Sequence, residues 1–71
     1  MSKYVYFMIV DQRTMERLND YYKTEAEARQ EAEQAIAEGD CPNPLYICKV
    51  VCTQNARGKT TRKDYYNMGL V

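Results

Sequence analysis

Two apolar runs along the chain have the pattern of β-strands. Residues 3–10 (KYVYFMIV) are rich in β-branched and aromatic side chains, and a period of two puts Val5, Phe7 and Ile9 on the better core face. Residues 45–53 (LYICKVVCT) are largely apolar on both faces, which is typical of a strand in the centre of a sheet. These two segments are the clearest β elements that the sequence predicts.

Residues 24–38 have the pattern of an amphipathic helix. Thr24 is a good N-cap residue, and Glu27 three residues later completes a capping box. Gly39 supplies the stop at the C-terminal end. Because alanine is small, the apolar stripe can pack closely on a sheet but adds little buried area, so we expect a thin core. This stripe consists of Ala28, Ala32, Ala35 and Ile36.

The remaining segments are less regular. Residues 11–14 are polar and predict a turn, while residues 15–22 fit either a second strand or a short helix. The short connection favours the strand, in a hairpin with the first one. Residues 62–70 can return as a last strand after a loop that contains Gly58. Residues 1–71 are then a single α+β domain, one helix on a small antiparallel sheet, in the order strand–strand–helix–strand–strand.

Size and composition argue against catalysis. The chain has 71 residues and no histidine, so it lacks the commonest general base and the commonest metal ligand. A chain of this length also has little room for a concave substrate pocket. We therefore expect a protein that is not an enzyme, binds no metal and needs no cofactor.

The cysteines and the first apolar run bear on location. The chain has an odd set of three cysteines, Cys41, Cys48 and Cys52, whereas small secreted proteins carry paired ones. The apolar run at residues 4–10 lacks a small-residue cleavage site and is too short to span a membrane. The sequence therefore predicts a cytoplasmic protein with reduced thiols and no membrane contact.

The charges are sorted by segment, although ten basic and ten acidic residues give a net charge of zero. Residues 24–40 contain six acidic side chains and one base, Arg29, whereas residues 55–63 contain four bases and no acid. Such a separation makes a small protein an electrical dipole, which influences which partners approach it.

The acidic part of this dipole is a row on the predicted helix. It is either an ordinary solvated face or a surface that imitates a phosphate backbone toward a basic groove. The row is formed by Glu27, Glu31, Gln34 and Glu38.

The basic part is either a solubilising hairpin tip or a cluster that neutralises phosphates or binds carboxylates. The sequence pI of about 6.2 lies below the value of about 9 that is typical of dedicated nucleic-acid domains. The cluster consists of Arg57, Lys59, Arg62 and Lys63.

Tyrosine is the third candidate feature, with seven residues against one phenylalanine and no tryptophan. Alternation can place Tyr6, Tyr46 and one of Tyr65 and Tyr66 on one outer sheet face. Such a face can stack on bases, receive a protein, or simply complete a thin core with its hydroxyls at the rim.

In size, architecture and segregated charge, the chain resembles the small accessory proteins of bacteriophages and mobile elements, including anti-CRISPR-type inhibitors. The resemblance implies blockade of a larger nucleic-acid-handling host protein or ribonucleoprotein complex through Glu27, Glu31 and Glu38 or through the basic loop with nearby tyrosines. One alternative is a sheet module that binds RNA or DNA directly with its tyrosines and basic loop. Another is a structural homodimer that enlarges the small core.

Overall fold

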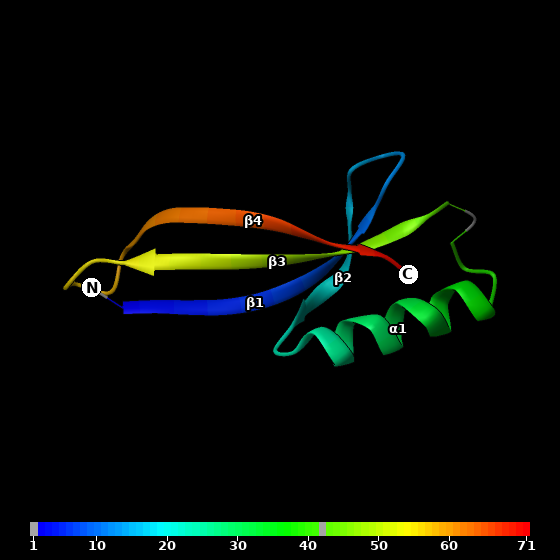
Figure 1. The fold of residues 1–71 in the computed structure, drawn as a ribbon, viewed down its shortest axis with the longest axis horizontal. Coiled ribbons are helices and arrows are strands. Elements are labelled where there is room, and N and C mark those ends of the chain that lie inside the picture. The colour runs from blue at the N-terminus through cyan, green and yellow to red at the C-terminus, as the bar shows by residue number, and fades with distance from the viewer. Residues whose placement is uncertain (1, 42) are drawn as a thin grey trace.

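The computed structural model describes residues 2–41 and 43–71. Within them, four antiparallel strands form one sheet in the order β2-β1-β3-β4, and one helix packs on it (Figure 1). The α+β architecture and the order of elements predicted from the sequence are confirmed, and both irregular segments contain strands. The elements are β1 (Ser2–Asp11), β2 (Arg17–Tyr22), α1 (Glu25–Ala37), β3 (Leu45–Gln54) and β4 (Thr60–Leu70).

Local side-chain and backbone contacts fix both ends of α1. At its start, the Thr24 hydroxyl accepts a 3.2 Å hydrogen bond from the Glu27 amide, which is the N-cap half of the predicted capping box. At its end, the Gly39 amide donates to the carbonyl of Ile36 and the Asp40 amide donates to that of Ala35. This pair of bonds is a Schellman motif, and it requires the left-handed conformation that Gly39 adopts with φ of 75°.

The main core lies between α1 and one end of the sheet. Phe7 and Leu18 pack against this core from the strands. Its fully buried members are Ile9, Ala28, Ala32, Leu45 and Ile47.

The predicted core pattern was wrong at two positions. Val5 and Ile36 are each 42% exposed. Val5 lies near the start of β1, opposite Val51, whereas the strand residues of the core pair near the other end, at Ile9 and Ile47. A period of two shows which face a side chain is on, but not whether another element covers that part of the face.

A second buried cluster lies on the other face of the sheet. It contains Val10, Cys48, Val50 and Cys52, and the side chains that pack against it are Tyr6, Met8 and Tyr46. These come from β1 and β3, so on this face tyrosine rings cover the sheet in place of a helix. We call it the helix-free face.

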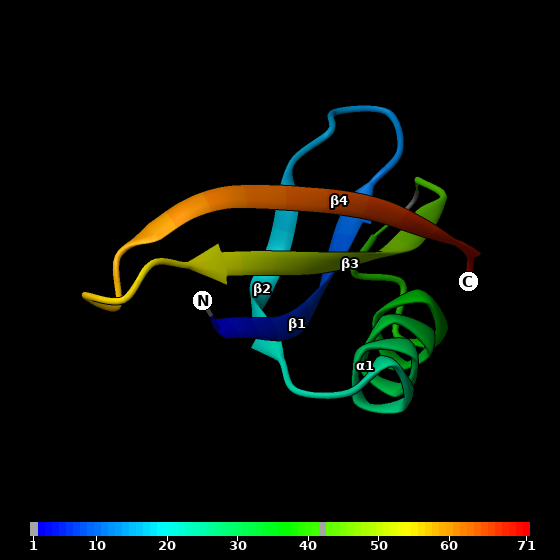
Figure 2. The same ribbon diagram turned by 60° about the vertical axis from the view of Figure 1, so that its left-hand side comes forward.

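The molecule is elongated, with principal extents of 44 × 21 × 17 Å. Helix α1 lies toward one end and the loop between β3 and β4 projects at the other (Figure 1). Figure 2 shows that β2 and the second half of β1 cross the direction of β4 at a steep angle. Beyond the helix, the first half of β1, the second half of β3 and the first half of β4 therefore form an arm with two accessible faces.

Candidate functional site

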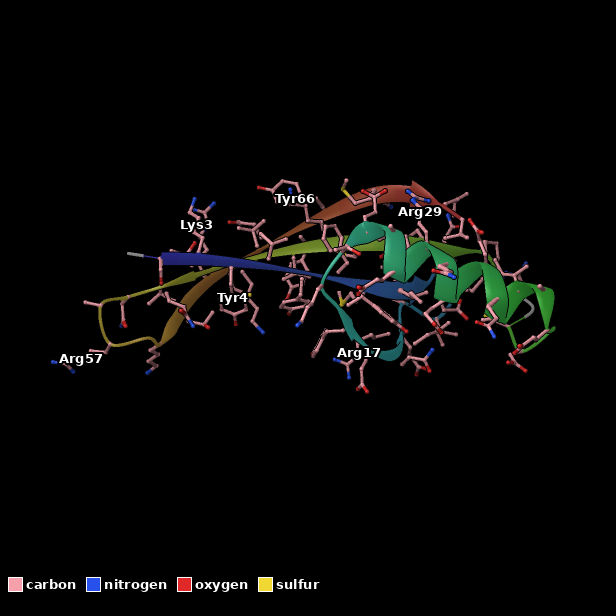
Figure 3. The ribbon with its side chains drawn as sticks, turned by 90° about the horizontal axis from the view of Figure 1, so that it is seen from below. Lys3, Tyr4, Arg17, Arg29, Arg57 and Tyr66 are labelled. Atoms are coloured by element: carbon pink, nitrogen blue, oxygen red, sulfur yellow. The ribbon has the colours of Figure 1, made fainter. Side chains whose placement is uncertain are left out.

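Strand pairing assigns the side chains of the arm to its two faces. Tyr6, Val50 and Tyr65 are directly opposite one another on β1, β3 and β4, as are Tyr4, Cys52 and Lys63. Residues paired in this way share a face, and both rows belong to the helix-free face. Figure 3 shows Tyr4 and Arg17 on one side of the sheet, with Lys3 and Tyr66 on the other.

Tyr6 is the centre of an aromatic cluster on the helix-free face. Its ring centroid is 6.3 Å from that of Tyr4 in a stacked arrangement and 4.5 Å from that of Tyr21 in an edge-on arrangement. The Arg17 guanidinium lies over the Tyr21 ring, 4.3 Å from its centroid, in a cation–π contact. A continuous line of contacts thus runs from Arg17 on β2 to Tyr4 on β1.

The chemistry of Tyr6 reflects this central position. Burial raises the pKa of its hydroxyl to about 12, and the neighbouring groups Cys52, Tyr21, Tyr65 and Tyr4 add to the increase. The hydroxyl therefore remains protonated at physiological pH and offers no negative charge to the face. Burial also raises the pKa of Tyr46 and that of Cys48.

The rings around Tyr6 are open to solvent. The exposed fractions are 41% for Tyr4, 53% for Tyr21 and 59% for Tyr65. Core tyrosines that only complete a thin sheet would turn their rings inward, as Tyr6 does in part. The three outer rings instead leave much of their surface available for contact with another molecule.

The charge on the part of this face formed by β1, β3 and β4 has one sign. Arg17 on β2 and Lys63 on β4 lie at its two sides. None of the β1, β3 and β4 positions that the register places on this face is a carboxylate. Those positions are Ser2, Tyr4, Tyr6, Met8, Val10, Tyr46, Cys48, Val50, Cys52, Gln54, Thr60, Lys63, Tyr65, Asn67 and Leu70.

The predicted basic cluster is divided by the structure. Arg57 and Lys59 are exposed in the loop at the end of the arm. The Asn55 side chain orders this loop by accepting the Arg57 and Lys59 amides at 2.9 and 3.1 Å. Arg62 is paired with Thr53 on the opposite face to Lys63, and it forms a 2.9 Å salt bridge with Asp64.

The other predicted site residues are far from this cluster. Tyr46 is on the helix-free face, but four residues along β3 from Val50, which corresponds to about 13 Å. Glu27 and Glu31 are exposed on α1 and Glu38 is exposed at its C-cap, toward the other end of the molecule. Tyr6, Tyr65 and Lys63 are therefore the predicted residues that the fold brings onto one local surface.

Sequence reasoning missed three members of this surface: Tyr4, Tyr21 and Arg17. The alternation of Tyr4 with Tyr6 was a usable signal. For Tyr21 and Arg17 there was none, because β2 pairs with β1 through an irregular register between Leu18 and Tyr22, where Asn19 has φ of 59°. A shift of this kind changes which side chains share a face.

No pocket is found among residues 2–41 and 43–71. The same residues contain no cluster of three or more side chains arranged to hold a metal ion. Nor does this part of the chain include a helix with the length and hydrophobicity needed to cross a membrane. Comparison with known proteins finds no matching family model, no similar curated protein and no similar solved structure.

Proposed function

We propose that this protein is a cytoplasmic, non-enzymatic interaction protein that blocks a larger nucleic-acid-handling host complex, in the manner of phage-type inhibitors. The observation that supports this proposal is the spatial separation of charge. The acidic row lies on α1, and Arg57 and Lys59 lie at the opposite end of a molecule 44 Å long. A complex of basic protein and nucleic acid offers complementary charge to both ends.

The acidic end suits a basic protein groove. Glu27, Glu31 and Glu38 are exposed and lie about half a turn around α1 from Arg29. Arg29 is directed elsewhere, to Glu25 and to the β4 backbone. The row therefore presents carboxylates one and two helical turns apart on a capped helix, and presentation on a rigid element lowers the entropic cost of binding.

The test is capture of the partner from a nuclease-treated lysate of the native host, followed by identification and binding with the purified partner. The acidic variant is Glu27→Gln, Glu31→Gln and Glu38→Gln together. We expect it to weaken the complex about tenfold and to reduce its salt dependence, because three charges that steer association with a basic groove are removed together. The matched control makes the same change in net charge outside α1: Glu16→Gln, Asp20→Asn and Asp64→Asn.

The proposal predicts a partner that handles nucleic acid and that binds the control variant normally. Equal binding by the acidic variant would show that the row is only a solvated face. The mass of the free protein at micromolar concentration is measured first, because twice the monomer mass would instead support the structural homodimer.

A further inference from the structure

We propose that the helix-free face of the arm is a binding site for single-stranded nucleic acid. The site consists of the rings of Tyr4, Tyr6, Tyr21 and Tyr65 between the cations Arg17 and Lys63. This site is distinct from the acidic row on α1. The proposal depends on the residues of the site and is independent of the proposed function.

Ring exposure is the first argument. Unpaired bases bind proteins chiefly by stacking on aromatic side chains, and stacking needs exposed ring surface. Tyr4, Tyr21 and Tyr65 provide it, whereas Tyr6 is more enclosed and holds Tyr4 and Tyr21 in place. The cluster is thus ordered before the ligand arrives, which reduces the entropy lost on binding.

Charge complementarity is the second argument. A phosphate backbone needs cations beside the stacking rings and no carboxylate among them. Arg17 and Lys63 meet the first requirement. The β1, β3 and β4 positions on this face meet the second, and the acidic residue on β2 is Asp20, which precedes Tyr21 in the chain. Five of the ten acidic side chains of this neutral protein are instead on α1 and its C-cap. A basic protein partner would meet like charge here.

The dimensions fit a short single strand. The cluster extends from β2 to β4, across three strand spacings of roughly 4.8 Å, or about 14 Å in all. Four-stranded sheets that bind RNA through exposed aromatics stack two or three bases over such a width. Beyond this cluster, Arg57 and Lys59 on the end loop can contact the phosphates of the next nucleotides.

The test measures fluorescence anisotropy of labelled oligouridylate and oligothymidylate of about 12 nucleotides, with a duplex of equal length alongside. We expect the single strands to bind at about 50 mM salt and the duplex to bind more weakly, because its bases are already stacked. If the site neutralises two to four phosphates, a plot of the logarithm of the binding constant against the logarithm of the salt concentration should have a slope of about −1.5 to −3. Comparison of the two single strands shows whether RNA or DNA is preferred.

Adjacent residues on β4 provide matched variants. Tyr65→Ala should weaken binding at least about fivefold, as loss of one stacking ring does. Tyr66→Ala removes a ring of similar exposure, 51%, from the opposite face and should leave binding unchanged. Likewise, Lys63→Gln should weaken binding and reduce its salt dependence, whereas Arg62→Gln on the opposite face should do neither.

Three results would overturn the inference. The first is that neither single strand binds at low salt, and the second is that Tyr65→Ala and Tyr66→Ala weaken oligonucleotide binding equally. The third is that Tyr65→Ala binds the oligonucleotide normally but no longer binds the captured host protein. The last result would assign the face to a protein. The inference and the proposed function can fail separately, because one is tested on free oligonucleotides and the other on the acidic row with nuclease-treated lysate.

Discussion

The Arg29 guanidinium on α1 donates a 2.7 Å hydrogen bond from Nη2 to the carbonyl oxygen of Met68 on β4. Its Nη1 donates to the Leu70 carbonyl at 3.3 Å, and its Nε pairs with Glu25 at 2.8 Å. Strand β4 is at the edge of the sheet, where unpaired carbonyls are open to another chain. One arginine thus joins the helix to the end of this strand and covers part of the exposed edge.

Arg29→Ala should destabilise the fold by about 1–3 kcal/mol, because two main-chain hydrogen bonds to a cation are lost. Hydrogen exchange of the Val71 amide, which donates to the Leu45 carbonyl, should also become faster as the end of β4 loosens. Arg29→Lys should recover less than half of the loss, since a lysine cannot reproduce the forked donation. Arg13→Ala, at an exposed arginine on the β1–β2 turn, is the control for urea unfolding.

Met15 is a position where substitution should stabilise the protein. It adopts φ of 61° in the β1–β2 turn and is 66% exposed, so it combines a strained backbone with little packing. Met15→Asn should raise the free energy of unfolding by about 0.5–1 kcal/mol, because asparagine tolerates this conformation better. Thr14→Asn is the neighbouring control. Equal or lower stability of Met15→Asn in thermal unfolding would contradict the prediction.

Asp11 links the β1–β2 turn to the loop before β3, and the stability of the fold should therefore depend on pH in the acidic range. The Asn43 amide donates to its carboxylate at 3.0 Å and is the main reason that the Asp11 pKa lies below its usual range. The carboxylate also accepts the Arg13 and Thr14 amides. Its contribution to stability is complete above the unfolded pKa of about 3.9 and is lost as the pH falls through the lower folded value.

Asn43→Ala should therefore raise the Asp11 pKa, lower stability at neutral pH and lessen the further loss below about pH 4. NMR titration of the Asp11 carboxyl and urea unfolding at both pH values measure these effects. Gln12→Ala, at an exposed position next to Asp11, is the control. An unchanged Asp11 pKa in Asn43→Ala would show that the turn amides and the Cys41 thiol account for the shift.

The raised pKa of Tyr6 should make the stability of the fold decrease at alkaline pH. Its folded pKa of about 12 exceeds the ordinary value of about 10, so its stabilising contribution is complete below pH 10 and is lost as the pH rises toward 12. Tyr6→Phe should show a smaller loss of stability over this interval. Tyr66→Phe, on the opposite face, should retain the full loss. Circular dichroism during urea unfolding at several alkaline pH values distinguishes the two variants.

The types of α1, β1 and β3 followed from local properties of the sequence. Thr24, Glu27 and Gly39 marked the ends of α1 because capping depends on neighbouring backbone groups. The apolar runs marked β1 and β3, since side-chain alternation is built into an extended backbone. The positions of the acidic and basic segments were likewise visible along the chain, although not how far apart they lie.

Only the tertiary structure decided which side chains form a surface. Alternation allowed Tyr6 to share a face with either Tyr65 or Tyr66, but pairing through Val50 selected Tyr65. The irregular β1–β2 register then brought Tyr21 and Arg17 beside Tyr6. The physical reason is that pairing register and the position of the helix depend on contacts between distant segments, which local propensity and alternation do not specify.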